Sequence, residues 1–215
     1  MIGSQVAALL TKGYARAASH VGMPHQQYRP ASAINPLTTV LATVNASFNI
    51  GGSYKSQAKA DQTLWQCITD AGTLQVGDFL VGSFTWSVIG MQALMPVLAL
   101  RCNDSITVSR GTPLFDPTDG LHDTLTVIAQ ALPVYVQLKR DKGFSEPVGF
   151  PAPSNSSAAM PMLDLTLGLG GVVPAGFIEA GDMVTLSSGQ KFKVDAVTTS
   201  TVTMALACTP YEPTA

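Results

Sequence analysis

The sequence predicts a mainly β protein in which an N-terminal α-helix precedes two related small units, each an SH3-like β-barrel or a β-sandwich. Three observations support this fold class: helical periodicity is confined to the N-terminus, the remaining chain is β-branched and punctuated by Gly, Pro and Asn, and one segment recurs later. We therefore divide the chain into a helix and extended arm at 1–36, a first β unit at 37–115 and a second β unit at 116–215.

The helix is predicted over residues 4–20, where apolar side chains recur at three- and four-residue steps. Ser4 can cap its first turn, and Gly22 and Pro24 end it. The chain from 25 to 37 then reads as extended, because its two prolines disfavour helical geometry in the residues that precede them.

The β units are predicted from short apolar runs separated by turn residues, such as FLVG, DSITVSR, VYVQLKR and FKVDAV. Runs of this length at frequent intervals are typical of β-sandwiches and small barrels. Two segments, 110–123 and 143–161, are instead rich in turn-forming residues. We expect the first to be a linker or crossing loop and the second to be a long Pro/Ser-rich loop within the second β unit.

An internal repeat links the two β units. The segment GTLQVGDFLV at 72–81 matches GFIEAGDMVT at 176–185, an offset of 104 residues. Two extra residues in the following turn change the offset to 106. At that offset the sequence aligns Trp86 with Phe192, Val88 with Val194, Leu98–Leu100 with Met204–Leu206, and Cys102 with Cys208. The repeat predicts that a Gly-Asp turn followed by three antiparallel strands occurs twice.

Candidate subunit-interface residues come from two segments. Tyr28, Arg29 and Pro30 form a stiff extended stretch after the helix. Either Tyr28 packs across the root of the helix, or this stretch adds as a strand to the sheet of a neighbouring subunit. Phe150 and Pro151 lie in the long Pro/Ser-rich loop, which we interpret as an arm that reaches a neighbour.

The composition excludes several classes of protein. Only 12% of residues are charged and 46% are hydrophobic, which excludes a disordered chain, and a net charge of −2 argues against strong nucleic-acid binding. The three cysteines form no CxxC pair, so we expect neither a zinc site nor a disulfide framework. The N-terminus lacks a signal-peptide pattern and no apolar run is long enough to span a bilayer, so we expect no membrane partner.

The usual catalytic motifs are missing from the sequence. It contains no GxSxG, Walker A, HExxH or EF-hand pattern. The glycine-rich stretch at 168–173 lacks the third glycine of a dinucleotide fingerprint and is predicted to be a strand end or bulge. His20 and His25 straddle a helix end, and His122 stands beside Asp119 and Asp123 in a turn-rich segment. We predict that the protein is not an enzyme and has no metal, no cofactor and no catalytic residues.

Five runs, together with the opening helix, carry a resemblance to a known class of proteins. They are QYRP at 27–30, DFLVG at 78–82, TW at 85–86, QALMP at 92–96 and LRCN at 100–103. Across roughly residues 5–110 the chain resembles structural proteins encoded in the morphogenesis regions of tailed bacteriophages and prophages. The resemblance implies a virion component at the neck, tail or baseplate, of adaptor, completion or baseplate type, that is assembled in the host cytoplasm.

We therefore expect a structural subunit whose partners are further copies of itself, in a ring, and other virion proteins. Charge-poor surfaces fit this expectation, because permanent interfaces are depleted of charge. Two alternatives remain at this point: a β-sandwich module that binds a receptor or carbohydrate, and a phage-associated hydrolase.

Overall fold

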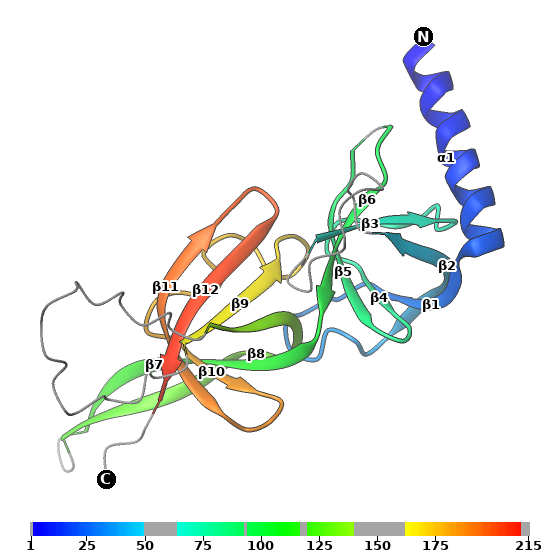
Figure 1. Cartoon of the computed structure of the whole chain (residues 1–215). Coiled ribbons are helices and arrows are strands. Elements are labelled where there is room, and N and C mark those ends of the chain that lie inside the picture. Colours follow the sequence, from blue (N-terminus) through cyan, green and yellow to red (C-terminus); the bar gives the residue numbers. More distant parts are fainter. Residues whose placement is uncertain (1, 50–63, 93, 117–119, 140–161, 212–215) are drawn as a thin grey trace, which may run out of the picture.

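A computed structural model describes residues 2–49, 64–92, 94–116, 120–139 and 162–211. The predicted helix is confirmed as α1, Ile2–Val21, and strands make up most of the rest of the described chain (Figure 1). The strands of the first half are β1 Met23–Tyr28, β2 Val40–Asn49, β3 Leu64–Thr69, β4 Phe79–Val81, β5 Thr85–Gly90 and β6 Val97–Cys102. Those of the second half are β7 Asp104–Asp116, β8 Gly120–Lys139, β9 Met162–Gly168, β10 Met183–Leu186, β11 Lys191–Thr199 and β12 Thr203–Pro210.

The two halves have the same topology. The first is a closed barrel with strand order β1-β2-β3-β6-β5-β4, and the second is a closed barrel with order β7-β8-β9-β12-β11-β10. Neighbouring strands are antiparallel throughout. In each barrel the fourth strand returns to lie beside the first, which is a Greek-key connection. The mainly β fold class with two related units is therefore confirmed.

The repeat predicted from the sequence is confirmed at its Gly-Asp turns. Gly77 and Gly181 both have positive φ, +94° and +98°, which an L side chain rarely adopts. The Gly77 amide donates to the Val88 carbonyl at 2.8 Å, and the Gly181 amide donates to the Val194 carbonyl at the same distance. The two turns are thus copies of one structure.

The sequence alignment of the last strand in each unit was wrong. Val88 pairs with Ala99 in the first barrel, whereas Val194 pairs with Cys208 in the second. Cys208 therefore occupies the position of Ala99 and not that of Cys102. The β11–β12 hairpin is longer than the β5–β6 hairpin, and this changes the offset between the last strands. Because these strands are apolar and similar in composition, an alignment displaced by a few residues still matches apolar residues with apolar residues.

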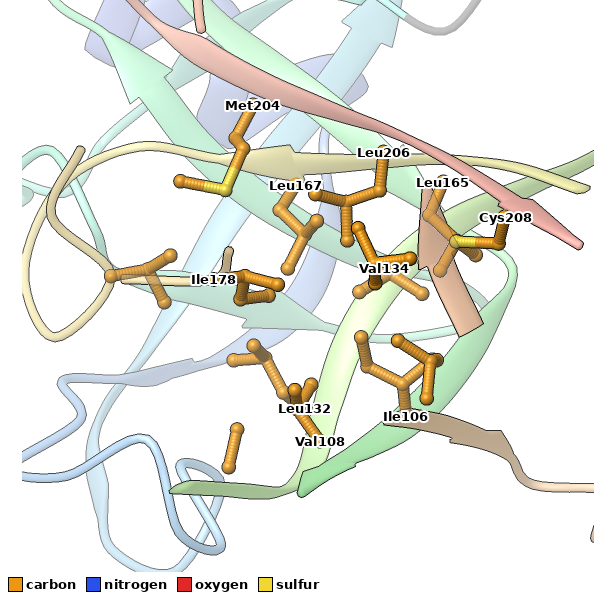
Figure 2. Close-up of a cluster of buried hydrophobic side chains, with 14 of the residues drawn as sticks. Ile106, Val108, Leu132, Val134, Leu165, Leu167, Ile178, Met204, Leu206 and Cys208 are labelled. Carbon is orange, nitrogen blue, oxygen red and sulfur yellow. The ribbon is translucent and has the colours of Figure 1, made fainter. Parts of the chain in front are cut away.

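Each barrel surrounds its own hydrophobic core. The side chains labelled in Figure 2 point into the second barrel from β7, β8, β9 and β12 and from the loop that carries Ile178. The smaller core of the first barrel contains Leu80, Trp86 and Val88. Alternation along the strands produces this arrangement, since every second side chain faces the interior of a barrel.

The two barrels are joined by one residue, Asn103, between β6 and β7. Its side chain accepts a hydrogen bond from the Val136 amide (2.7 Å) and donates one to the Val136 carbonyl (2.9 Å). The β1–β2 connection also reaches the second barrel, where Gln130 exchanges backbone hydrogen bonds with Ala33 and Asn35. These contacts fix the junction from two sides.

The observed domain boundary differs from the predicted division at 115/116. The first barrel ends at Cys102, and β1, assigned above to the N-terminal arm of 1–36, is one of its strands. The segment 110–123 is not a linker, because residues 110–116 belong to β7 and pair with residues 120–126 of β8. A content of Pro, Gly and Asp is typical of hairpins and linkers alike, so composition alone could not distinguish them.

Candidate assembly surface

The predicted interface residue Arg29 belongs to an intramolecular ion pair. Its Nε donates to Asp78 Oδ1 at 2.8 Å and its Nη2 to Oδ2 at 2.9 Å. The Asp78 side chain is only 1% exposed, and it also accepts hydrogen bonds from Gln27 Nε2 (2.7 Å) and the Gln75 amide (2.9 Å). Hydrogen bonding to Asp78 raises the pKa of Arg29 above its already high usual value.

The second barrel contains the same ion pair. Arg110 Nε and Nη2 donate to the two oxygens of Asp182, each at 2.8 Å, and the Glu179 amide donates to Asp182 at 2.9 Å. Arg110 lies on β7 and Arg29 directly follows β1, so each pair ties the first strand of a barrel, or the residue after it, to the turn before the fourth strand, where the barrel closes. Because both barrels have this pair, it is part of the fold.

Tyr28 does not pack across the root of the helix, because its half-buried side chain packs against the core cluster of the second barrel. Tyr28 pairs with Val40 of β2 on one side and with Phe79 of β4 on the other, so no neighbouring strand can pair with this residue. Arg29 and Pro30 follow β1, and addition of these two residues to the sheet of a neighbouring subunit stays a prediction.

The remaining predicted interface residues, Phe150 and Pro151, and the whole loop at 143–161 lie outside the described residues. An interface role for Phe150, Pro151 and the solvent-facing parts of Tyr28, Arg29 and Pro30 stays a prediction.

The cysteines are buried free thiols. Burial raises the pKa of each of them, Cys67, Cys102 and Cys208, to about 12. Within the described ranges no group of three or more His, Cys, Asp and Glu side chains is placed to hold a metal ion. His20 is exposed, while His25 is buried with its Nδ1 at 2.8 Å from the Met23 carbonyl.

The structure shows an exposed apolar surface that sequence reasoning missed. The half of α1 that precedes Tyr14 projects beyond the first barrel (Figure 1), and the β5–β6 hairpin lies beside it. We call the apolar side chains exposed here the apical patch: Val6 41%, Leu9 69%, Leu10 36%, Met91 45%, Leu94 47% and Met95 56% exposed. The sequence does offer one signal of this surface, since Met91, Leu94 and Met95 are large apolar residues that lie close together next to Pro96.

The members of the apical patch are spatially connected. One cavity of about 160 Å³ is lined by Leu10, Met91, Leu94 and Met95 together with the less exposed Tyr14 and Leu74. Val6, Leu9 and Leu10 stand at i, i+3 and i+4, and therefore share one face of α1. Leu94 also has φ +70°, a strained geometry for a non-glycine residue.

At the other end of the molecule, the β7–β8 hairpin projects beyond the second barrel (Figure 1). Leu125 and Val127 on β8 are 57% and 43% exposed there. The molecule thus presents a projecting element with exposed apolar side chains at each end.

Comparisons with known proteins leave the chain without an assigned family: no family model, curated protein or solved structure matches it. Among the described residues, no helix combines the length and the apolar character needed to cross a membrane.

Proposed function

We propose that the protein is a structural subunit of a tailed-phage particle that assembles with further copies of itself into a ring at the neck, tail or baseplate. The observation that carries this proposal is the apical patch. The apolar face of the N-terminal half of α1 stays largely exposed, with Val6 41% and Leu9 69% exposed, and most helix stability in proteins comes from packing such a face. A neighbouring copy supplies that packing.

Three further features support an assembly role. Closed barrels leave their backbone hydrogen bonds internally satisfied, which suits a rigid subunit that associates through side chains. The low charge content lowers the desolvation cost of permanent interfaces. Different projecting elements at the two ends suit a head-to-tail contact, and such contacts form a ring when the rotation between neighbouring copies closes. Each half remains, in this proposal, an SH3-like unit, and the assembled subunit resides in the virion.

The proposal is tested by sedimentation equilibrium of the purified chain at micromolar concentrations, for the unchanged protein and for Leu9→Glu. We expect an oligomer for the unchanged protein. Leu9→Glu should weaken association at least about tenfold, since it places a charge in an apolar contact at a position that is 69% exposed in the subunit.

The matched control is Leu41→Glu, which adds the same charge at a 49% exposed leucine on β2, outside the apical patch. It should leave the association unchanged. The assembly role is contradicted if the unchanged protein stays monomeric, both alone and in the presence of neighbouring virion proteins. Equal weakening by both variants contradicts the assignment of the contact to the apical patch.

A further inference from the structure

The open mouth of the first barrel contains an aromatic cavity of about 320 Å³. Phe48 and Trp86 stack there with ring centroids 3.9 Å apart and planes 5° from parallel. Trp65 meets Trp86 edge to face at 5.3 Å, and Phe84 does so at 6.4 Å. A cavity of this size falls at the small end of the range typical of small-molecule sites, which occur preferentially in places such as barrel mouths.

One cation stands in the wall of this cavity. The guanidinium carbon of Arg101 lies 3.9 Å from the centroid of the Phe84 ring, and both residues also line a larger groove, of about 620 Å³, at the junction of the barrels. Within the part of the chain that the structure describes, Arg101 has no carboxylate partner. This distinguishes it from Arg29 and Arg110, which are both paired.

The second barrel serves as an internal control for what the fold itself requires. Strand register places Trp86 opposite Arg101 in the first barrel and Phe192 opposite Pro210 in the second. The same register identifies the equivalent positions of the other residues that line the cavity. The second barrel has Ile106 where the first has His25, and Val136 where the first has Phe48. It has Leu163 where the first has Trp65, and Pro210 where the first has Arg101. An ordinary apolar interior is therefore sufficient to close this barrel, and at these described positions the second barrel has no counterpart of Phe48, Trp65 or Arg101.

From these observations we infer that the mouth of the first barrel binds a planar aromatic group that carries a carboxylate. The aromatic walls present ring faces and edges to a flat ring, and the unpaired guanidinium donates two parallel hydrogen bonds to a carboxylate. A sugar fits less well, because few of the described side chains that line the cavity can form hydrogen bonds. Besides Arg101 these are Ser47, Ser83, His25 and the indoles of Trp65 and Trp86, and His25 Nδ1 already lies 2.8 Å from the Met23 carbonyl.

The chain contains its own reporter of binding. It has two tryptophans, Trp65 and Trp86, and both line this cavity. Tryptophan fluorescence excited at a wavelength that phenyl groups do not absorb therefore reports on the mouth of the first barrel alone. Suitable probes are 3-phenylpropionate, its alcohol 3-phenylpropanol, its amine 3-phenylpropylamine and glucose.

We expect a saturable fluorescence change with 3-phenylpropionate, with the alcohol and the amine at least about tenfold weaker and glucose without effect. Arg101→Gln should weaken binding of the acid about tenfold and remove its advantage over the alcohol. The control Lys193→Gln removes an exposed cation from β11 of the second barrel and should bind like the unchanged protein.

Equal binding of acid and alcohol by the unchanged protein overturns the inference, as does the absence of any saturable change or a preference for glucose. The ligand series needs no variant, so it decides the question even where Arg101→Gln does not fold. A capped Phe-Asp dipeptide identifies the source of the ligand: tighter binding than 3-phenylpropionate indicates a neighbouring protein chain, and weaker binding indicates a free small molecule.

Discussion

At the scale of single residues, the repeated arginine–aspartate pair is the most informative feature. The sequence does single out Arg29 and the Gly-Asp turn that contains Asp78, but as unrelated elements. The two are 49 residues apart in the chain, and only the closure of the barrel brings the guanidinium to the carboxylate. Sequence patterns report local geometry, so a pairing of this kind stays invisible until the topology is known.

We predict that Asp78→Ala lowers the free energy of unfolding by about 2 to 3 kcal/mol, because the buried amide of Gln27 and the Gln75 backbone amide both lose their acceptor. Urea denaturation measures this change. Asp182→Ala should behave alike in the second barrel. The control Asp195→Asn, at an exposed position, should stay within about 0.5 kcal/mol of the unchanged protein. Equal stabilities of Asp78→Ala and Asp195→Asn would show that the carboxylate does not hold the barrel closed.

At the scale of secondary-structure elements, the helix and most strands could be predicted, because their apolar periodicity is local. The register of β12 could not, since a hairpin of different length leaves the apolar pattern intact. The Gly168–Val173 stretch was correctly predicted to be a strand end, as β9 ends at Gly168. The need for a glycine at position 168 comes from the other barrel. A Cβ at Gly168 would lie 2.5 Å from Ser87 Oγ and 2.5 Å from Ile89 Cγ2.

We therefore predict that Gly168→Ala destabilises the protein by about 1 to 3 kcal/mol, because its methyl group forces apart the contact between β9 and β5. The melting temperature and urea midpoint measure the effect. Gly72→Ala is the matched control: nothing lies within 4 Å of its added methyl, so it should be neutral or slightly stabilising. A fully stable Gly168→Ala variant would mean that the barrels do not approach each other this closely.

At the scale of the whole molecule, two barrels of identical topology have taken on different surfaces. The first carries the helix, the apical patch and the aromatic mouth, and the second carries the long hairpin. The duplication could be predicted from the sequence, and the low charge content can be read from it directly. Which apolar surface stays exposed could not be predicted, because the exposure of a side chain depends on its neighbours in space. The apical patch, a helix face together with a hairpin some eighty residues later, is such a case.

In the proposed assembly, neighbouring copies cover the apical patch. Electron cryomicroscopy of the purified protein at tens of micromolar shows whether they do. We expect closed rings in which α1 and the β5–β6 hairpin of each subunit lie against the next subunit. Isolated subunits, or rings in which α1 projects into solvent, would show that the patch is not the contact between copies.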